Sequence, residues 1–368
     1  ARETTSEAPV WFVGHALPEQ LAGADLEGAV VLALYDAPDD APSYSERAAA
    51  LREAGAAAVI SIMNADVPWQ AVTASYAGGQ TQLAADGRAP ISGAMALGAA
   101  ERLVRIGGGD IARAADSGFV PTPLDLRASL DVSTEVRPYT SHNVIGRLAG
   151  SGEGGERVLY LGHWDHLGIC RPESAEDRIC NGAVDNASGI AMMIEIARAI
   201  AEGPRPVRDL LFMGTTAEEM GLLGAEYFGA NPTVPLDSIV AAINIDTVAI
   251  AEAGEPVATV GRGLTPLDPL IEETARELGR EIDTDDEANA FVQRQDGWVL
   301  TRAGVPTVMV GGSFANMEAL GAFLSGPYHK PEDDLDRPLV LEGAAEDTEL
   351  LIALGRKLAD PEQYQPRR

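Results

Sequence analysis

The sequence predicts an α/β protein whose mixed, mostly parallel central sheet is flanked by helices, with a smaller α/β domain before it. The main observation is an alternation of short apolar runs and helical stretches from Val158 onward, a pattern typical of parallel sheets covered on both faces. The chain has 368 residues, of which 46% are hydrophobic, which is enough for two buried cores. No apolar run approaches the ~20 residues that span a bilayer, so we expect no membrane insertion.

The charge balance is strongly acidic, with 56 Asp and Glu against 27 Lys and Arg and a formal net charge of −29. A surface of this sign repels phosphate backbones and anionic lipids, which excludes nucleic acid and the membrane surface as main partners. Most of the excess is explained by solubility, because a cation-binding site needs only a few carboxylates.

The first region, residues 10–120, combines apolar runs with two helical stretches. The nine residues before it are polar, and we expect them to be frayed. Ser45–Gly55 and Ala99–Ile106 predict helices, the former with a serine at its start and a glycine at its end. The region has one histidine, His15, and no cysteine, so we do not expect it to carry catalysis. Strands are predicted at Val10–Gly14, Ala29–Tyr35, Ala57–Ile62 and Ile91–Leu97.

A proline-containing stretch at residues 120–128 predicts a linker between two regions. Beyond it, Leu130–Thr134 and Asn143–Leu148 are expected to pair as strands. Gly150–Gly155 is glycine-rich, but it lies between two predicted strands and no helix follows it. We therefore interpret it as a hairpin turn and not as a phosphate-binding loop.

The second region carries the strand and helix alternation. The predicted strands are Val158–Leu161, Asp209–Thr215, Ser238–Ile245, Val257–Val260 and Thr307–Val310. The predicted helices are Ser188–Ala201, Gly221–Phe228, Pro266–Leu278, Asp296–Ala303 and Ala344–Leu358. In an open α/β sheet, ligands bind at the carboxyl ends of the strands.

One stretch of the second region places His163, Asp165 and Asp185 between the end of a strand and the start of a helix. Two cysteines, Cys170 and Cys180, flank the polar loop inside it. They could be metal ligands or a disulfide. Zinc sites built from cysteine usually have two to four residues between the pair, so we favour a disulfide, which would imply an oxidising compartment.

Further carboxylates and a histidine follow the later strands. The adjacent Glu218 and Glu219 would repel each other, unless a metal ion bound one and left the other free as a base. Acids at a helix N-terminus explain them equally well. Asp246 could be an ordinary N-cap, and His329 an exposed loop histidine. Taken with the earlier histidine and aspartates, the set suits zinc, cobalt or manganese.

Two aspartates lie at short offsets from histidines. Asp165 is two residues after His163, and Asp333 is four residues after His329, which Tyr328 precedes. Each aspartate could hold the second ring nitrogen of its histidine. The other histidines have no such neighbour and are not expected to be ligands: His15, His142 and His166.

Six strings in order resemble the co-catalytic di-zinc aminopeptidases of clan MH: NVIGRL, HWDHLG, NGAVDNASG, FMGTTAEEMGLLGAEYF, INID and YHKPEDD. The resemblance spans residues 143–358 and implies the zinc-exopeptidase fold with two Zn²⁺, for which Co²⁺ or Mn²⁺ could substitute. It implies five metal ligands, with His163 and Asp246 on one zinc, Glu219 and His329 on the other, and Asp185 bridging them.

The resemblance also implies the catalytic roles. Glu218 would be the general base, Asp165 would orient His163, and Tyr328 would hydrogen-bond the tetrahedral intermediate. The peptide bond after Asp185 is expected to be cis, despite the usual cost of about 3 kcal/mol. The substrates would be peptides with a free N-terminal amine, held against acidic groups near the metals.

The strings FVGHAL, LEGAVVLALYD and ERAAALREAGAAAVISI resemble a protease-associated domain. We therefore expect this domain at residues 1–122 and a zinc metallopeptidase domain at residues 123–368. Relatives carry an N-terminal segment before the inserted domain, and we expect this chain to lack it. Where close relatives have the string Arg-Ser-Asp-His, residues 294–297 read RQDG, so the preference of the specificity pocket does not transfer.

The expected function is that of a metal-dependent aminopeptidase, secreted or periplasmic. A carboxypeptidase or dipeptidase on the same fold is the alternative within enzymes. A relative that cyclises N-terminal glutamine usually uses one metal, and the retention of His163 and of the Glu218–Glu219 pair argues against it. A receptor-like binding protein without catalysis is the alternative from another class, and the retention of all five ligands and the base argues against it.

Overall fold

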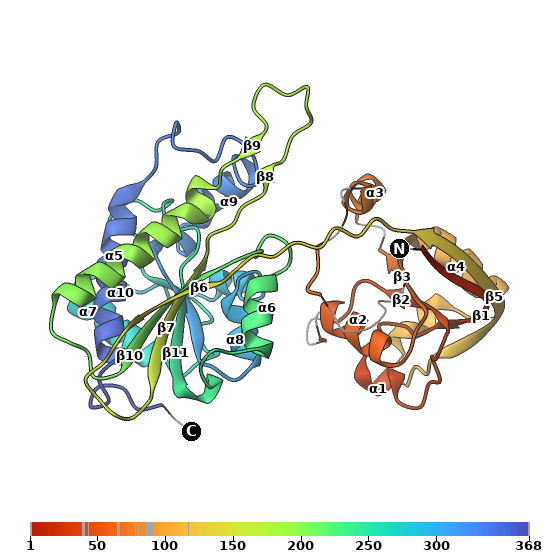
Figure 1. Cartoon of the computed structure of the whole chain (residues 1–368), viewed down its shortest axis with the longest axis horizontal. Helices are drawn as coiled ribbons and strands as arrows, with labels where there is room; N and C mark the ends of the chain where they lie inside the picture. Colours follow the sequence, from red (N-terminus) through yellow and green to blue (C-terminus); the bar gives the residue numbers. More distant parts are fainter. Residues whose placement is uncertain are drawn as a thin grey trace. The chain divides into compact units, whose positions relative to one another are not determined.

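The computed structural model describes residues 2–38, 41–42, 44–64, 67–77, 79, 81–84, 91–116 and 118–366. The chain forms two compact units, Ala1–Tyr139 and Thr140–Arg368, each built on its own sheet (Figure 1). The division therefore falls after Tyr139, whereas we expected it after residue 122. Among the described residues, no helix is both long enough and apolar enough to cross a lipid bilayer.

The first unit contains a five-stranded sheet in the order β4-β3-β2-β1-β5, in which β5 alone is antiparallel to its neighbour. The strands are β1 (Arg2–Phe12), β2 (Val30–Leu34), β3 (Ala58–Met63), β4 (Ile91–Ala96) and β5 (Thr122–Ser133). The helices are α1 (Pro18–Leu21), α2 (Tyr44–Glu53), α3 (Trp69–Ala77) and α4 (Leu97–Ile106). All four predicted strands and both predicted helices of this region are confirmed, while α1 and α3 were not predicted.

We expected the N-terminal residues to be frayed, but they form part of a strand. Residues 2–9 belong to β1, and its register with β5 runs from Arg2 opposite Ser133 to Phe12 opposite Thr122. The ladder satisfies main-chain groups that a frayed end would leave to water.

The expected linker at residues 120–128 is also wrong, because most of it belongs to β5. Pro123 fits there because β5 is an edge strand, which tolerates proline. The expected pairing of Leu130–Thr134 with Asn143–Leu148 does not occur. The former pairs with β1 in the first sheet, and the latter joins the second sheet.

The second unit contains a six-stranded sheet in the order β12-β13-β11-β7-β10-β6. The four inner strands are parallel, and the two edge strands are antiparallel to them. The strands are β6 (Val144–Leu148), β7 (Arg157–His163), β10 (Asp209–Thr215), β11 (Ile239–Asn244), β12 (Ala258–Val260) and β13 (Thr307–Gly311). A separate two-stranded ribbon consists of β8 (Gly168–Ile169) and β9 (Ile179–Cys180).

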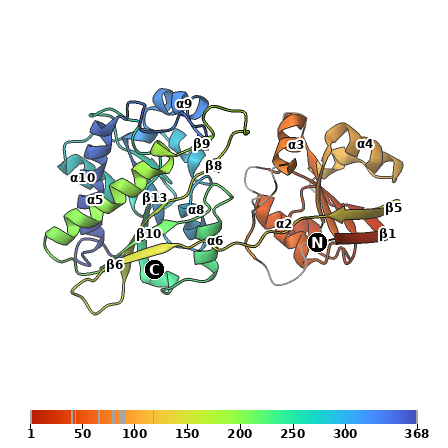
Figure 2. The same ribbon diagram turned by 45° about the horizontal axis from the view of Figure 1, so that its top comes forward.

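Helices cover both faces of the second sheet (Figures 1 and 2). Val158 and Tyr160 of β7 pack in one core with α5, α7 and α10, and Leu159 and Leu161 pack in the other core with α6 and α8. Side chains alternate between the faces of a strand, so a strand covered on both faces must be apolar throughout. The helices are α5 (Gly189–Glu202), α6 (Leu223–Ala230), α7 (Asp268–Glu277), α8 (Gly297–Arg302), α9 (Met317–Ser325) and α10 (Leu341–Leu358).

The predicted strands and helices of the second region are confirmed, whereas α9 and the β8–β9 ribbon were not predicted. The hairpin expected at Gly150–Gly155 is wrong, because β6 pairs with β10 and not with β7. The glycine at position 150 serves close packing instead. A Cβ there would lie 2.2 Å from the carbonyl oxygen of Val207.

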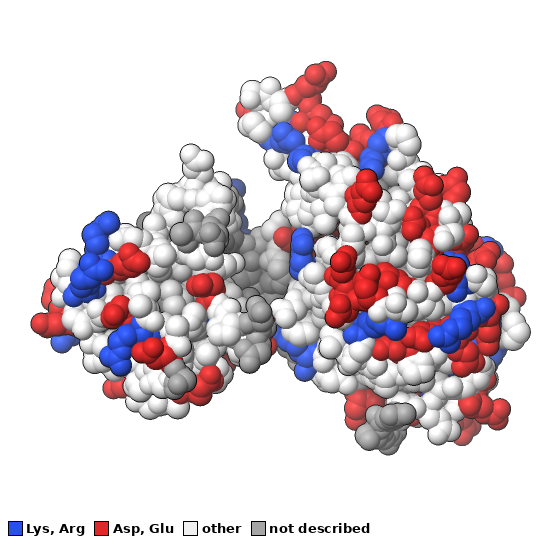
Figure 3. All heavy atoms as spheres, turned by 180° about the vertical axis from the view of Figure 1, so that it is seen from behind, with Lys and Arg blue, Asp and Glu red and all other residues white. Residues whose placement is uncertain are grey.

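The acidic excess is visible at the surface of the second unit. Figure 3 shows Asp and Glu side chains spread over the visible face of this unit, with Arg and Lys between them. Within α5, Arg198 pairs with Glu195 and Glu202. Such exposed pairs contribute little stability, so the surface charge is consistent with solubility.

Candidate metal centre

The carboxyl ends of the parallel strands bring the predicted site residues together. His163 is the last residue of β7 and lies opposite Thr215, the last residue of β10. Glu218 and Glu219 follow Thr215 after two residues, and Asp246 follows β11, the other neighbour of β7. Residues that are up to 83 positions apart in sequence therefore meet at one edge of the sheet.

Asp185 lies in the loop that leads into α5, and the peptide bond that follows it is cis, as expected. The Asn186 side chain ties this loop to the end of β11. Its amide nitrogen donates to the carbonyl oxygen of Ile245 at 2.8 Å, and its oxygen accepts from the N–H of Thr247 at 3.3 Å. These bonds hold the loop of Asp185 beside the residue that precedes Thr247, which is Asp246.

Two groups of ligand atoms share Asp185. In the first, which we call the strand side, Nε2 of His163 lies 3.0 Å from Asp185 Oδ1 and 3.7 Å from Asp246 Oδ1. In the second, the loop side, Nε2 of His329 lies 3.4 Å from Asp185 Oδ2 and 2.9 Å from Glu219 Oε2. A tetrahedral zinc ion with bonds of about 2.0–2.1 Å separates its ligand atoms by about 3.3 Å, so both spacings fit a bound ion.

Buried ligand atoms that make no hydrogen bond gather at this point. They include Nε2 of His163, Nε2 of His329 and Oε1 of Glu219. A buried polar atom without a partner costs about 1–3 kcal/mol, and a cation shared by these atoms would remove that cost. His163, Asp185 and Glu219 alone place one ligand atom each within 4.8 Å of one another. The donors are imidazoles and carboxylates, which suit zinc.

Burial and neighbouring charge shift the pKa values at the site. Burial raises the pKa of Asp185, but its contacts with His163 and His329 outweigh this and hold that pKa well below its usual range. Burial raises the pKa of Glu218 to about 9, and the negative charge of Asp246 adds to the effect. A divalent cation would oppose this shift and favour the ionised carboxylate, which can accept a proton.

Asp165 contacts both His163 and the main chain of Glu218. Its carbonyl oxygen lies 3.0 Å from Nδ1 of His163, whereas its carboxylate is 3.9 Å from the same nitrogen. The carboxylate accepts instead from the N–H of Glu218 at 3.2 Å. Asp165 is therefore placed to orient the imidazole through its main chain and the loop of Glu218 through its side chain.

The partnership expected between Asp333 and His329 is wrong. The Asp333 side chain is fully buried, and its two oxygens accept from the N–H groups of Val184 and Asp185 at 3.0 and 3.1 Å. Although Asp333 is only four residues from His329 in sequence, its side chain contacts the loop that precedes α5. It therefore supports the main chain at Asp185, not the histidine.

We expected His166 to have no carboxylate partner, but it contacts one in the structure. Its side chain is 6% exposed, and Nδ1 contacts Oε1 of Glu219. Its ring centre lies 5.7 Å from that of His329. The sequence signal was a second histidine three residues after His163, and it was missed because the partner carboxylate is distant in sequence. In the described part of the chain, no ion pair joins His15 or His142 to these carboxylates.

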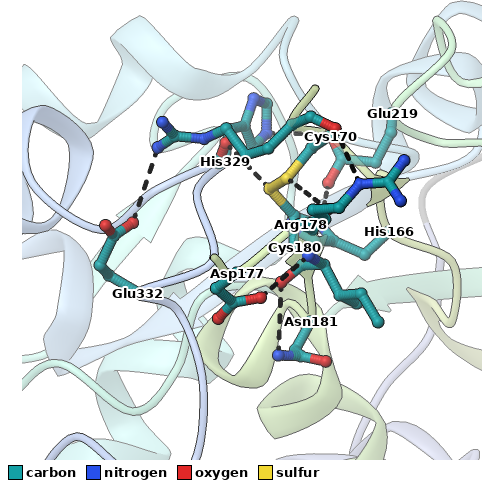
Figure 4. The surroundings of a disulfide bond; sticks show 11 residues. His166, Cys170, Asp177, Arg178, Cys180, Asn181, Glu219, His329 and Glu332 are labelled. Atoms are coloured by element: carbon teal, nitrogen blue, oxygen red, sulfur yellow. Dashed lines mark hydrogen bonds and ion pairs between the residues drawn. A yellow bond between two sulfur atoms is a disulfide. The ribbon is translucent and has the colours of Figure 1, made fainter. Parts of the chain in front are cut away.

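The disulfide that we favoured between Cys170 and Cys180 is present. Figure 4 shows that it borders the segment of His329: the Cys180 sulfur lies 3.4 Å from the carbonyl oxygen of His329. The Arg171 guanidinium is 3.8 Å from the Glu332 carboxylate in the same segment. The closed loop thus contacts the loop side of the centre.

A cleft opens beside the carboxylates. Glu218 and Tyr328 line it, and the Tyr328 ring stacks on His329 with 3.7 Å between ring centres. Burial raises the pKa of Tyr328, so its hydroxyl stays protonated and can donate. Arg294 also lines the cleft. The apolar lining of the cleft consists of Phe291, Met309, Phe314, Leu320 and Leu324.

Asp296 is a buried acid to which sequence reasoning gave no role. It accepts a hydrogen bond from the Thr215 hydroxyl, and burial raises its pKa to about 7. Its charge in turn contributes to the raised pKa of Glu218. No signal in the string RQDG identifies an acid that the fold buries beneath β10.

Comparison with known proteins places residues 143–353 in the profile of peptidase family M28. Aminopeptidase NAALADL1 of Mus musculus is 29% identical over 168 residues, which are 44% of this chain and 20% of that protein. The glutamate carboxypeptidase 2 homolog of Caenorhabditis elegans is 26% identical over 218 residues, which are 56% of this chain and 25% of that protein. Leupeptin-inactivating enzyme 1 of Streptomyces exfoliatus is 29% identical over 195 residues, covering 50% and 40%.

The chain thus spans less than half the length of these curated relatives. Among solved structures, the aminopeptidase from Aneurinibacillus sp. strain AM-1 aligns with a TM-score of 0.53 at 18% identity. The alignment covers 98% of this chain and 75% of that one, and it shows a common fold. Because the family profile covers more than half of the sequence, the chain belongs to peptidase family M28.

Proposed function

We propose that the protein is a di-zinc aminopeptidase that releases N-terminal residues from peptides. The observation that carries this proposal is the position of Asp185 between two imidazoles. One of its oxygens lies 3.0 Å from His163 and the other lies 3.4 Å from His329. A single ion would need only one of these groups, so two groups on two oxygens favour two ions.

The strand side, His163 and Asp246, would hold one zinc, and the loop side, Glu219 and His329, would hold the other, with Asp185 between them. When bound, the ions would polarise the scissile carbonyl and lower the pKa of the attacking water. Co²⁺ and Mn²⁺ suit the same donor set.

Glu218 acts as the general base in this proposal. It lines the cleft next to the ligand Glu219, and the Asp165 carboxylate holds its main-chain N–H. The Glu218 carboxylate takes the proton of the attacking water and passes it to the leaving amine. Tyr328, protonated in the same cleft, donates a hydrogen bond to the oxygen of the tetrahedral intermediate.

The substrate class follows from the charge of the cleft. Glu218 lines it and is not among the proposed ligands, so its carboxylate can attract a protonated N-terminal amine when the ions offset the charge of Asp185 and Asp246. A carboxypeptidase or dipeptidase is the second candidate. It is supported by Arg294 in the cleft lining, which could pair with a terminal carboxylate, and by the name of the Caenorhabditis elegans relative.

Peptide cleavage distinguishes the two candidates. An aminopeptidase cleaves aminoacyl substrates with free N-termini, leaves acyl-blocked peptides intact and stops when a chelator is added. Equal cleavage of blocked and free N-termini would reject the aminopeptidase. Release of C-terminal residues from blocked peptides would establish the carboxypeptidase.

The Glu218→Gln variant tests the general base. We expect kcat to fall by about 10²–10⁴-fold, because the amide cannot accept the proton of the water. Zinc content should remain that of the wild type, since Glu218 is not among the ligands. Glu226→Gln, a half-buried acid of α6 that pairs with Arg302, is the control. Unchanged turnover in Glu218→Gln would remove this residue from the mechanism.

We further propose that the first unit is a protease-associated domain and that the protein works in a secreted or periplasmic setting. The disulfide supports an oxidising compartment, since such bonds are rare in the cytosol. Thiol labelling of protein taken directly from its source organism tests this: two free thiols per chain would contradict the assignment.

A further inference from the structure

We propose that His166 is a positioning residue that holds Glu219 for the metal ion of the loop side, an inference that rests on the proposed di-zinc function. Two imidazoles approach the Glu219 carboxylate, one at each oxygen. His329 faces Oε2 at 2.9 Å, and Nδ1 of His166 contacts Oε1. Because Oε2 also belongs to the group around Asp185, Oε1 is the oxygen left for a second partner.

Glu219 needs such a partner because its carboxylate is 3% exposed and buried away from water. Oε1 of Glu219 and Nδ1 of His166 are both buried and form no hydrogen bond with other groups of the described residues, so each has the other as its contact. A ligating carboxylate whose second oxygen is held by a donor keeps its orientation when the metal is absent. His166 can supply that donor when its Nδ1 carries the proton, because this nitrogen is the ring atom that contacts Oε1.

The disulfide-closed loop explains why His166 reaches this position. Residue 168 of β8 lies opposite Cys180 of β9, so the two ends of the loop, His166 and Gly182, lie together. A Cβ at Gly182 would be 2.6 Å from Cγ of His166 and 2.2 Å from the carbonyl oxygen of Asp185. Its backbone has a φ of +71°, which also favours glycine. Only a glycine allows the imidazole to pack this closely.

The test compares His166→Leu with His166→Asn in the full-length zinc protein. Leucine has a similar volume but no donor, whereas asparagine places its amide nitrogen near the position of Nδ1. The matched controls are His142→Leu and His142→Asn, because His142 is an exposed histidine of the same unit. The measurements are zinc per chain during titration with a chelator, and the absorption spectrum of the Co²⁺-substituted proteins at saturation.

We expect His166→Leu to release one of two ions at a chelator concentration about 10–100-fold lower than the wild type requires. His166→Asn should recover most of this loss, and all the saturated Co²⁺ spectra should match the wild type because no ligand has changed. Equal thermal unfolding of the metal-free variants shows that the fold is intact. Gly182→Ala should displace His166 and lower the affinity for the same ion.

Two results would overturn the proposal. If His166→Leu binds both ions as the His142 variants do, His166 has no role at the centre. If His166→Asn is as damaging as His166→Leu and both change the Co²⁺ spectrum, His166 is itself a ligand. Failure of the wild type to bind two ions would instead reject the di-zinc function, so the two failures are distinguishable.

Discussion

The two sides of the metal centre differ in how the chain holds them. On the strand side, His163 ends β7 with a side chain that is 2% exposed, and Asp165 fixes its Nδ1. On the loop side, His329 lies outside any strand or helix, has a φ of +57° and is 36% exposed. Its main chain is instead bordered by the disulfide at Cys180.

This difference indicates which side of the centre should lose its ion more readily. Ligands on sheet strands are positioned by ladder hydrogen bonds and two buried cores, whereas ligands on loops depend on local crosslinks. The loop side has three such supports: the disulfide, the contact of His166 with Glu219, and the stacking of Tyr328 on His329. We therefore expect the ion of the loop side to be the first lost.

The largest effect is expected from removing one imidazole. His163→Ala should lose the ion of the strand side and weaken the other, because Asp185 loses a partner in the core of the site. His329→Ala should keep about one ion per chain, and both variants should lose turnover, because each proposed ion takes part in the reaction. Zinc analysis after dialysis measures this. A lower zinc content in His329→Ala than in His163→Ala would contradict the comparison.

Asp333→Ala should affect both sides through the ligand they share. The change leaves the buried N–H groups of Val184 and Asp185 without acceptors, at a cost of about 2–5 kcal/mol in the free energy of unfolding. Denaturant unfolding of the metal-free protein measures this loss. Asp333→Asn keeps one acceptor and should lose less. If both variants released only one ion more readily, Asp185 would not be shared.

Removal of the disulfide should act on the loop side alone. Cys170→Ser with Cys180→Ser opens a short loop and should cost roughly 2–3 kcal/mol of stability. One of the two ions should then be removed by less chelator than in the wild type. If the double variant lost metal as completely as His163→Ala, the prediction would be contradicted, since the disulfide would then support both sides of the centre.

The smallest effect is a pH slope in the metal-free protein. The pKa values of Glu218 and His329 are raised to about 9 and that of Asp296 to about 7, so each group binds more protons folded than unfolded. Stability should therefore fall as pH rises from about 5 to 9.

Unfolding with and without zinc at pH 5, 7 and 9 checks this slope. Zinc replaces protons at the centre, so the loaded protein should lose less stability as pH rises. Glu218→Gln should reduce the slope of the metal-free protein. Parallel pH curves for the loaded and metal-free proteins would show that these groups do not titrate together with metal binding.

The sequence alone was sufficient for most strands and helices, because their apolar runs and end signals are local. It also placed the strand-end acids and His163, since residues that follow parallel strands must share one edge of the sheet. It failed at residues 120–128 and Gly150–Gly155, where strand pairing decides the structure. Proline and glycine there indicated turns, but an edge strand and a close main-chain approach accommodate them.

Only the tertiary structure decided which side chains touch across the loops. The offset between Asp333 and His329 resembled a supporting pair, yet the chain takes that aspartate to the main chain of Asp185. Sequence reasoning gave His166 no carboxylate partner, yet the fold brings it to Glu219, 53 residues away. The physical reason is that periodicity and caps act over a few residues, whereas the orientation of a loop side chain depends on every element packed around it.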